Sequence, residues 1–374
     1  MRIAYYVHLN LGADSGVFKK IVGQVMSWTE MGYEVRLFVF TRMNEVTEAL
    51  KCSPVANVAE CEVYPHGGWV SFAVRNRALN RLMSRVCLWR PEVIYSRMDM
   101  WYHAVWRTAS RIPLILEINA DELAELRQYS RPFYIYHLCT RGFTLRSAHG
   151  CVYVSHEIEA APAHRRYRKP GLILGNGIRM ADVPPLPERD SNEVSPRLAF
   201  IGQAGMPWHG VDKVLAMARS FPHWRFDLIG VTAGDIEETL PENVTAWGPM
   251  QSSDYRSAIL QNCDCGIGSL AMFRAHLTEA SPLKTREYLA LGLPVIIGYS
   301  DTDFLSGADF LLQLPNTGDN VETSLTAIHD FVERWRGKRV QRGDVMHLDS
   351  AVKERRRLDF MESAISGHAA KSQP

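Results

Sequence analysis

Residues 279–296 read Glu-Ala-Ser-Pro-Leu-Lys-Thr-Arg-Glu-Tyr-Leu-Ala-Leu-Gly-Leu-Pro-Val-Ile. Glu279 and Glu287 are separated by seven residues, and we expect a loop and the start of a helix between them. The helix then leads into the buried strand that begins at the Gly-Leu-Pro-Val-Ile run. A helix that feeds an apolar strand is the repeating element of a parallel α/β sheet.

The same alternation extends over the rest of the chain. In the second half, we expect strands at residues 197–202, 225–230, 244–247, 264–269 and 294–297, with helices at 211–220, 285–291, 320–336 and 350–365. In the first half, we expect strands at 3–7, 34–40, 93–95, 114–118, 152–154 and 171–174, with helices at 14–31, 71–90 and 121–147. Such alternation indicates parallel sheets that helices cover on both faces.

A segment rich in proline and polar residues, 183–192, separates the two halves, as linkers between domains do. The chain has 374 residues, which fits two domains of ordinary size. We therefore expect an N-terminal domain at 1–185 and a second domain at 186–349. We expect residues 350–374 to form a C-terminal helix.

Composition limits the class of protein. With 46% hydrophobic and 22% charged residues, the chain is neither disordered nor collagen-like. Residues 1–185 hold 23 basic and 16 acidic side chains, and the remainder holds 19 and 25. The halves therefore differ in charge, which suggests different partners or arises by chance. Seven cysteines without a C-x-x-C motif indicate reduced thiols and a cytoplasmic location.

Residues 279–296 also carry candidate chemistry. The carboxylates of Glu279 and Glu287 can accept paired hydrogen bonds from the vicinal hydroxyls of a sugar. Backbone N–H groups at the helix start suit a phosphate, and Lys284 adds positive charge there. An ordinary helix start with capping acids explains the same residues.

Two further turns could approach a phosphate. Gly16 opens the first expected helix, but the turn lacks the G-x-G-x-x-G of dinucleotide dehydrogenases. In residues 200–213 a strand enters a loop and then a helix, where Gln203 and His209 could donate hydrogen bonds. A tight turn at Gly16 and a surface histidine at 209 are the alternatives.

The E-x7-E segment with its E-Y-L-A-x-G-x-P-V-I run resembles the donor-site signature of family-4 retaining glycosyltransferases. Other segments resemble that family in the same order along nearly the whole chain: 16–17, 154–155, 175–178, 201–210 and 247–250. The resemblance implies the GT-B fold, in which two Rossmann-like, doubly wound parallel-sheet α/β domains face a central cleft. The first would be the acceptor side and the second the nucleotide-sugar donor side, with the C-terminal helix returning to the first.

The resemblance also implies residue roles. Glu287 would bind the ribose hydroxyls of the nucleotide, and Glu279 would contact the donor sugar near the reacting carbon. Gly16 would approach the diphosphate, and Met250 would lie against the base. The backbone between the glutamates would contact sugar and phosphate at Ala280, Ser281 and Leu283.

Three departures from the family pattern matter. Gln203 and His209 stand where the family has an Arg and a Lys on the diphosphate, so Lys284, a protonated His209 and helix N-termini must supply the charge. The run after Glu279 is Ala-Ser-Pro-Leu instead of the commoner Gly-Phe-Gly type. Asn119 replaces a histidine and can align a sugar or acceptor without shuttling a proton. The expected catalytic residues are thus Glu279, Lys284, His209 and Asn119.

The implied activity is configuration-retaining transfer from a UDP-, GDP- or other nucleotide sugar to a glycan or glycolipid acceptor, in surface polysaccharide biosynthesis. The leaving phosphate itself would take the acceptor proton, so the protein positions reactants and stabilises charge. The resemblance also implies that no metal and no cofactor are required, and the sequence likewise has no D-x-D beside an apolar strand and no His/Cys ligand cluster. The alternatives are another GT-B enzyme, such as a sugar-nucleotide epimerase or a phosphorylase, and a non-catalytic GT-B partner protein.

Basic segments in the first half suggest peripheral contact with the inner face of the membrane. Arg75, Arg77, Arg81 and Arg85 recur at roughly helical spacing among apolar residues, as in a basic amphipathic surface helix. A helix packed on the sheet explains the pattern equally. Residues 164–169 form a second basic cluster, compatible with a solvated loop or an anionic acceptor. No nucleic-acid partner is expected, since neither segment belongs to a recognisable binding motif.

Overall fold

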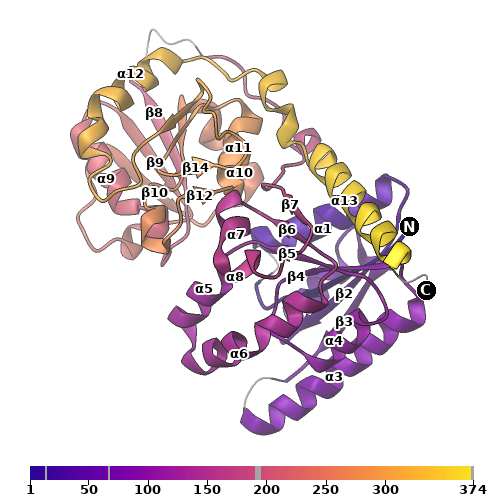
Figure 1. The fold of residues 1–374 in the computed structure, drawn as a ribbon. Coiled ribbons are helices and arrows are strands. Elements are labelled where there is room, and N and C mark those ends of the chain that lie inside the picture. The colour runs from indigo at the N-terminus through magenta and orange to yellow at the C-terminus, as the bar shows by residue number, and fades with distance from the viewer. Residues whose placement is uncertain (13–14, 66–67, 190–194, 372–374) are drawn as a thin grey trace. The chain divides into compact units, whose positions relative to one another are not determined.

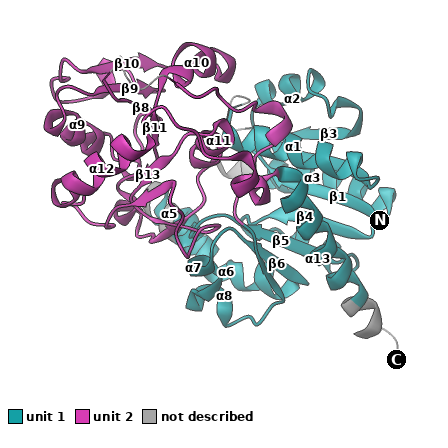
Figure 2. Ribbon diagram, turned by 90° about the horizontal axis from the view of Figure 1, so that it is seen from above, with its two compact units in different colours: residues 1–174, 350–374 teal, residues 175–349 magenta. Residues whose placement is uncertain are grey.

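The computed structural model describes residues 1–12, 15–65, 68–189 and 195–371, and these form two compact units. Unit 1 comprises Met1–Leu174 and Ser350–Pro374, and unit 2 comprises Gly175–Asp349 (Figure 2). The chain therefore passes between the units at 174/175 and again at 349/350. Residues 175–185, expected in the first domain, belong to unit 2.

The described part of the proline-rich segment is bound to unit 2. The N–H of Leu186 donates to the carbonyl of Leu291, and the N–H of Arg189 donates to the carbonyl of Gly337. Residues 190–192 of the expected linker lie outside the described residues. The segment therefore lies along the surface of unit 2 as far as residue 189.

Unit 1 is built on a seven-stranded parallel sheet (Figure 1). Its strands in spatial order are β3 (Ala59–Val63), β2 (Glu34–Thr41), β1 (Arg2–His8), β4 (Val93–Arg97), β5 (Leu114–Ile118), β6 (Gly150–Tyr153) and β7 (Gly171–Ile173). Side chains of β1 alternate between two apolar cores because successive residues point to opposite faces. Ile3 and Tyr5 pack in one core with α1 (Gly16–Glu30) and α13 (Ser350–Lys371), and Ala4 and Tyr6 pack in the other with α3 (Gly68–Trp89).

The helices of unit 1 are α1 (Gly16–Glu30), α2 (Asn44–Lys51), α3 (Gly68–Trp89), α4 (His103–Ala109), α5 (Glu122–Tyr129), α6 (Arg131–Ser147), α7 (His156–Ala160), α8 (Pro162–Arg165) and α13 (Ser350–Lys371). Strand β3 has no counterpart among the expected strands, because its Ala-Glu-Cys-Glu-Val sequence is only partly buried. The helix expected at 121–147 is two helices, α5 and α6, that meet at Ser130.

Unit 2 repeats the plan with six parallel strands. Their spatial order is β10 (Val244–Gly248), β9 (Arg225–Ile229), β8 (Arg197–Ile201), β11 (Cys265–Ile267), β13 (Val295–Ile297) and β15 (Leu311–Gln313), and a separate short pair joins β12 (Glu279–Ala280) to β14 (Ser300–Asp301). Its helices are α9 (Val211–Ser220), α10 (Ser252–Ala258), α11 (Leu283–Leu291) and α12 (Leu325–Trp335). Side chains of α9 and α12 share one core and those of α10 and α11 the other.

Strand order reverses beside the first strand of each sheet. In unit 1 the chain moves outward in opposite directions from β1 and β4, and in unit 2 from β8 and β11. Open parallel sheets bind ligands at the carboxyl ends of the strands at such a switch point. Functional residues are therefore expected in the loops that follow these strands.

Helix α13 is held in unit 1 by buried charges. Glu354 accepts a hydrogen bond from Trp28 Nε1 at 2.7 Å and forms an ion pair with Arg357. Arg357 also contacts Glu117, which pairs with Lys20 of α1 at 2.7 Å. Burial alone would raise the pKa of Glu117, but Lys20 and Arg357 outweigh it and lower that pKa to about 2.

Candidate functional site

The loop after β8 brings Gln203 and His209 to the carboxyl edge of the unit 2 sheet. It approaches the end of β9 so closely that a Cβ on Gly230 would lie 2.2 Å from the carbonyl oxygen of Gly202. Gly230 also has φ +84°, which glycine tolerates best. The two glycines therefore let the ends of β8 and β9 lie against one another. Gln203 is exposed.

His209 is held by the backbone of the same loop. The N–H of Gln203 donates to His209 Nδ1 at 3.2 Å, so we assign the ring hydrogen to Nε2. Burial, together with nearby Lys284, lowers the pKa of His209 to about 3. The protonated histidine considered from the sequence is thus absent near neutral pH, and His209 offers a neutral Nε2–H donor.

Lys284 is in the first turn of α11 and has a buried ammonium group. Its Nζ lies 4.5 Å from the centroid of the Phe200 ring and has no hydrogen-bond partner among the described residues. Burial lowers the pKa of Lys284 to about 7. An unpaired buried cation is unfavourable, so this position favours an anion that would pair with it.

Glu287 follows one turn later on α11, as expected, and its carboxylate is oriented by α10. Tyr255 Oη lies 2.9 Å from both carboxylate oxygens, and Arg256 Nε donates to Oε1 at 2.6 Å. The side chain of Glu287 remains 13% exposed. Because a carboxylate accepts about four hydrogen bonds, capacity remains for a diol, chiefly on Oε2.

Glu279 lies in the short strand β12, where the sequence suggested a loop, and it is buried. Ala280 beside it is also buried, and Leu283 opens α11 with its side chain partly exposed. No side chain caps the N-terminus of α11. A helix N-terminus of this kind attracts anions.

The turn between Glu279 and α11 is fixed by a buried arginine. Ser281 Oγ accepts from the N–H of Asn176 and from Arg286, both at 2.7 Å. Arg286 is fully buried and forms a bidentate pair with Asp301 at 2.7 Å for both bonds. The network fixes the backbone on which Glu279 and Lys284 stand.

Met250 follows β10 at the same edge of the sheet and packs against the α10–α11 core. Unit 2 thus brings nine of the eleven expected site residues, Met250 included, to the carboxyl edge of its sheet and the adjoining start of α11. The other two, Gly16 and Asn119, are in unit 1. Gly16 is the first residue of α1, and Asn119 follows β5 and accepts from Lys20 Nζ at 3.0 Å.

The carboxyl edge of the unit 1 sheet also has a polar cluster. His8 Nδ1 lies 2.8 Å from a carboxylate oxygen of Asp99, and His8 Nε2 lies 2.7 Å from Tyr64 Oη. Asn10 Nδ2 lies 2.9 Å from both His8 Nε2 and Tyr64 Oη. These mutual bonds satisfy the cluster internally.

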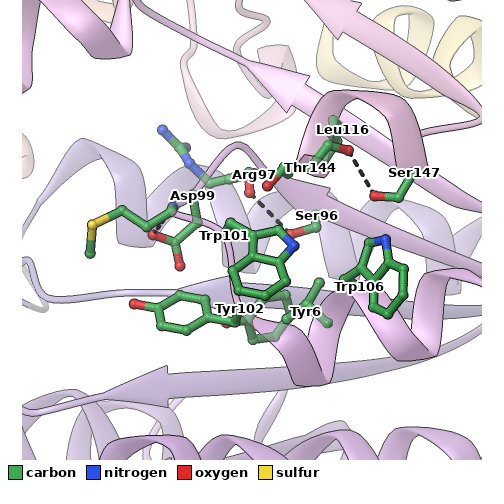
Figure 3. A pocket seen from close by; sticks show the side chains of 12 residues that line it. Tyr6, Ser96, Arg97, Asp99, Trp101, Tyr102, Trp106, Leu116, Thr144 and Ser147 are labelled. Carbon is green, nitrogen blue, oxygen red and sulfur yellow. Dashed lines mark hydrogen bonds between the residues drawn. The ribbon is translucent and has the colours of Figure 1, made fainter. Parts of the chain in front are cut away.

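Beside this cluster is a cavity of about 20 Å³, drawn in Figure 3. Asp99, Trp101 and Trp106 are among its lining residues. The Tyr6 hydroxyl and the Trp101 indole N–H have no hydrogen-bond partner among the described residues. The volume suits about one water molecule and is too small for a sugar.

Within the described ranges, no group of three His, Cys, Asp or Glu side chains is arranged to hold a metal ion. Among the helices of the described chain, none is both long and apolar enough to cross a bilayer.

Several site residues were missed from the sequence. Tyr255 and Arg256 orient Glu287 from a helix about thirty residues earlier, and Phe200 faces Lys284 from β8. No local pattern marks such pairs. Arg286 lies within residues 279–296, directly after Lys284 and Thr285, on a buried helix. That position is the one signal in the sequence that could have identified it, because a fully buried arginine needs anionic partners.

No family model and no curated protein sequence matches the chain. Solved structures do. HepE of Anabaena in complex with UDP has a TM-score of 0.67 at 12% identity, covering 97% of this chain and 100% of that one. A lipopolysaccharide outer core galactosyltransferase, WaaB, has 0.66 at 12%, covering 97% and 99%. Sucrose-phosphate synthase of Thermosynechococcus elongatus has 0.64 at 12%, covering 99% and 97%.

At such low identity the comparisons establish the fold. They agree with two units of doubly wound parallel sheet. The expected fold class is therefore confirmed, and the chain has the GT-B fold.

Proposed function

We propose that the protein is a glycosyltransferase that uses a nucleotide-sugar donor, bound at the carboxyl edge of the unit 2 sheet. The observation that carries this proposal is the buried Lys284 ammonium at the start of α11, which contacts the Phe200 ring but has no hydrogen-bond or ion-pair partner among the described residues. A diphosphate supplies the missing negative charge. Structural neighbours crystallised with UDP or UDP-glucose support a nucleotide sugar as the donor.

In this proposal the diphosphate binds Lys284, the N-terminus of α11 and the Nε2–H of His209. These groups stabilise the charge that develops as the donor bond breaks. Glu287 accepts hydrogen bonds from the ribose hydroxyls, while Tyr255 and Arg256 hold its orientation. Glu279 contacts hydroxyls of the donor sugar. The missing Arg and Lys at positions 203 and 209 are thereby offset by one cation from α11.

We further propose that transfer retains the anomeric configuration and that the acceptor is a glycan or glycolipid of surface polysaccharide biosynthesis. Retention rests on the resemblance of residues 279–296 to family-4 enzymes. The acceptor class is supported by the likeness to a lipopolysaccharide galactosyltransferase. Gly16 and Asn119 are proposed contacts of diphosphate and acceptor, respectively. Peripheral contact with the cytoplasmic face of a membrane stays part of this proposal.

Thermal-shift measurements with UDP, GDP, ADP and CMP test the donor site directly. We expect one nucleotide to raise the melting temperature, because a ligand that binds only the folded state stabilises it by mass action. No stabilisation by any of the four would refute the donor site. Binding without slow donor hydrolysis would favour the non-catalytic GT-B partner, and the anomeric proton coupling of a transfer product would decide retention.

The two glutamates are expected to have separable roles. Glu287→Ala should weaken nucleotide binding about tenfold, since charge-assisted hydrogen bonds contribute about 1.5–3 kcal/mol. Glu279→Ala should leave nucleotide affinity nearly unchanged and lower donor turnover. Calorimetric titration with the nucleotide and a donor hydrolysis assay measure the two effects. Asp330→Ala, an exposed carboxylate of α12, is the control, and wild-type behaviour of both glutamate variants would reject the assignment.

Donor affinity is expected to depend on pH through Lys284. Its pKa of about 7 in the free protein should rise when an anion binds. Binding therefore takes up a proton above about pH 7, and affinity should fall by up to about tenfold per pH unit there. Calorimetry should use a nucleotide sugar, because the terminal phosphate of a free nucleotide has a pKa of about 6 and would add its own pH dependence. Lys284→Arg should remove the dependence, and a flat wild-type profile would contradict it.

A further inference from the structure

Helix α6 presents an apolar face that the fold of unit 1 leaves uncovered. Its buried side, with His137, Arg141, Thr144 and Leu145, packs inward. On the opposite side, Ile135, Leu138 and Phe143 are 51%, 49% and 50% exposed. Leu138 and Phe143 lie three and eight residues after Ile135, so the three side chains share one broad face of the helix, with Ile135 between the other two. Several large apolar side chains exposed together mark an interaction surface.

Arginines stand at both ends of this face. Arg131 begins α6 and Arg146 lies near its end, and both are exposed. The sequence of α6 contains no acidic residue. An apolar stripe with arginines at its margins is typical of helices that lie in the surface of an anionic membrane.

A groove of about 380 Å³ adjoins this face, lined by Leu138, Cys139, Gly142, Arg146, Arg166 and Tyr167. The guanidinium carbons of Arg146 and Arg166 lie 5.7 and 5.0 Å from the centroid of the Tyr167 ring. Gly142 permits this packing, because a Cβ there would lie 2.9 Å from Tyr167 Oη. Two cations therefore flank one ring beside an apolar helix, which suits an anionic headgroup whose acyl chains contact the helix.

The helix proposed from the sequence is a poorer candidate. Arg81 pairs with Glu62, and Arg85 pairs with both Glu60 and Glu62. Arg75 stacks at 5.0 Å on Tyr64 and on Tyr102. Much of the positive charge of α3 is thus neutralised or held inside unit 1, whereas Arg146 and Arg166 are exposed.

We propose that one surface of unit 1, the α6 surface, docks onto a bilayer that contains anionic lipids. The α6 surface consists of Arg131, Ile135, Leu138, Phe143, Arg146 and Arg166. The inference deepens the glycolipid part of the proposed function by locating the membrane contact. A second copy of the chain is the weaker occupant, because a symmetric pairing would bring three arginines of each copy together. An anionic bilayer complements the same charges.

Co-sedimentation with phosphatidylcholine vesicles containing phosphatidylglycerol tests the proposal without donor or acceptor. We expect binding that weakens with salt and is absent from pure phosphatidylcholine. Arg146→Gln with Arg166→Gln should weaken binding at least tenfold, since each arginine near an anionic surface contributes about fivefold. Ile135→Ser with Leu138→Ser should weaken it by a similar factor through lost apolar burial.

Matched controls lie on α3. Leu88→Ser replaces a side chain that is 81% exposed, and Arg77→Gln replaces an exposed arginine. Both should bind vesicles as wild type. Equal loss in these controls, unchanged binding by the α6 variants, or no vesicle binding by wild type would overturn the proposal. Loss of a dimer in Ile135→Ser with Leu138→Ser, seen by analytical ultracentrifugation, would assign the surface to a second copy instead.

An exposed thiol in the groove gives a second readout. The emission of a polarity-sensitive dye attached to Cys139 should shift to the blue when the anionic vesicles are added. The same dye attached to Cys52, which is exposed at the C-terminal end of α2, should show no such shift. Nucleotide thermal shifts of every variant, recorded without vesicles, should match wild type. Failure of vesicle binding with intact nucleotide binding would therefore reject the docking surface alone, and the reverse result would reject the donor site alone.

Discussion

Lys284→Met is expected to weaken nucleotide binding about a hundredfold and to raise the melting temperature of the free protein by about 5 °C. The affinity falls because the diphosphate loses the buried cation that it would neutralise. The stability rises because methionine fills a similar volume over Phe200 without leaving an ammonium group unpaired. Calorimetric titration and scanning calorimetry measure the two effects.

The sign of the stability effect follows from the lowered pKa. Lys284 has a pKa of about 7 in the folded protein, against about 10.4 in an unfolded chain. The cost of its charge is complete below about pH 7 and diminishes as pH rises toward about 10. The stabilisation by methionine should therefore be larger at about pH 6 than at about pH 9.

Lys213→Met is the matched control. Lys213 is also buried in unit 2, but it donates to the carbonyl of Gly318 and pairs with Glu322. Its replacement should lower the melting temperature and leave nucleotide affinity close to wild type. If Lys284→Met instead destabilised the protein and bound nucleotide normally, Lys284 would be structural and the donor site would be misplaced.

Arg286→Met is expected to destabilise unit 2 by about 3–5 kcal/mol, because it leaves buried Asp301 without its partner. Asp303, Ser281 and the carbonyl of Asn176 lose hydrogen bonds as well. Arg286→Lys should rescue little, since an ammonium group cannot reproduce the bidentate geometry. Urea unfolding followed by intrinsic fluorescence measures the loss.

Arg274→Met provides the comparison at the surface. Arg274 also makes two 2.7 Å bonds to one carboxylate, that of Asp212, but both side chains are partly exposed. Its loss should cost less than about 1 kcal/mol. In the buried pair, Arg286→Met with Asp301→Asn should recover part of the stability. Equal effects of Arg274→Met and Arg286→Met would show that burial adds nothing to the buried network.

The alternation of strands and helices was predictable because apolar runs such as those of β1 and β8 are buried on both faces of their sheets. Strand β3 was not predictable, because it is an edge strand whose Glu60 and Glu62 form ion pairs with Arg85 of α3. The change of unit after Leu174 was missed, because proline content marks residues 183–192 while hydrogen bonds attach 186 and 189 to unit 2.

At the candidate site, the family resemblance of residues 279–296 singled out Glu279, Lys284 and Glu287, whereas their spacing alone fits an ordinary helix start as well. The sequence could not show that the Lys284 ammonium lacks a hydrogen-bond partner among the described residues, since its surroundings include Phe200 and the loop of His209, which are distant in the chain. The protonation of His209 was unpredictable for the same reason. Likewise, the apolar face of α6 became visible only once the buried face of the helix was known.

Helix α13 follows unit 2 in the chain, yet Leu358 and Met361 complete the unit 1 core, and Arg357 pairs with Glu117 and Glu354. During synthesis, residues 1–174 therefore emerge without one wall of their own core, and that wall arrives only after all of unit 2 has been made. Until then Glu117 lacks Arg357, and the apolar side of the sheet that α13 covers faces solvent. A chain that ends within unit 2 would therefore carry a first half whose apolar core is incomplete on the side that α13 covers.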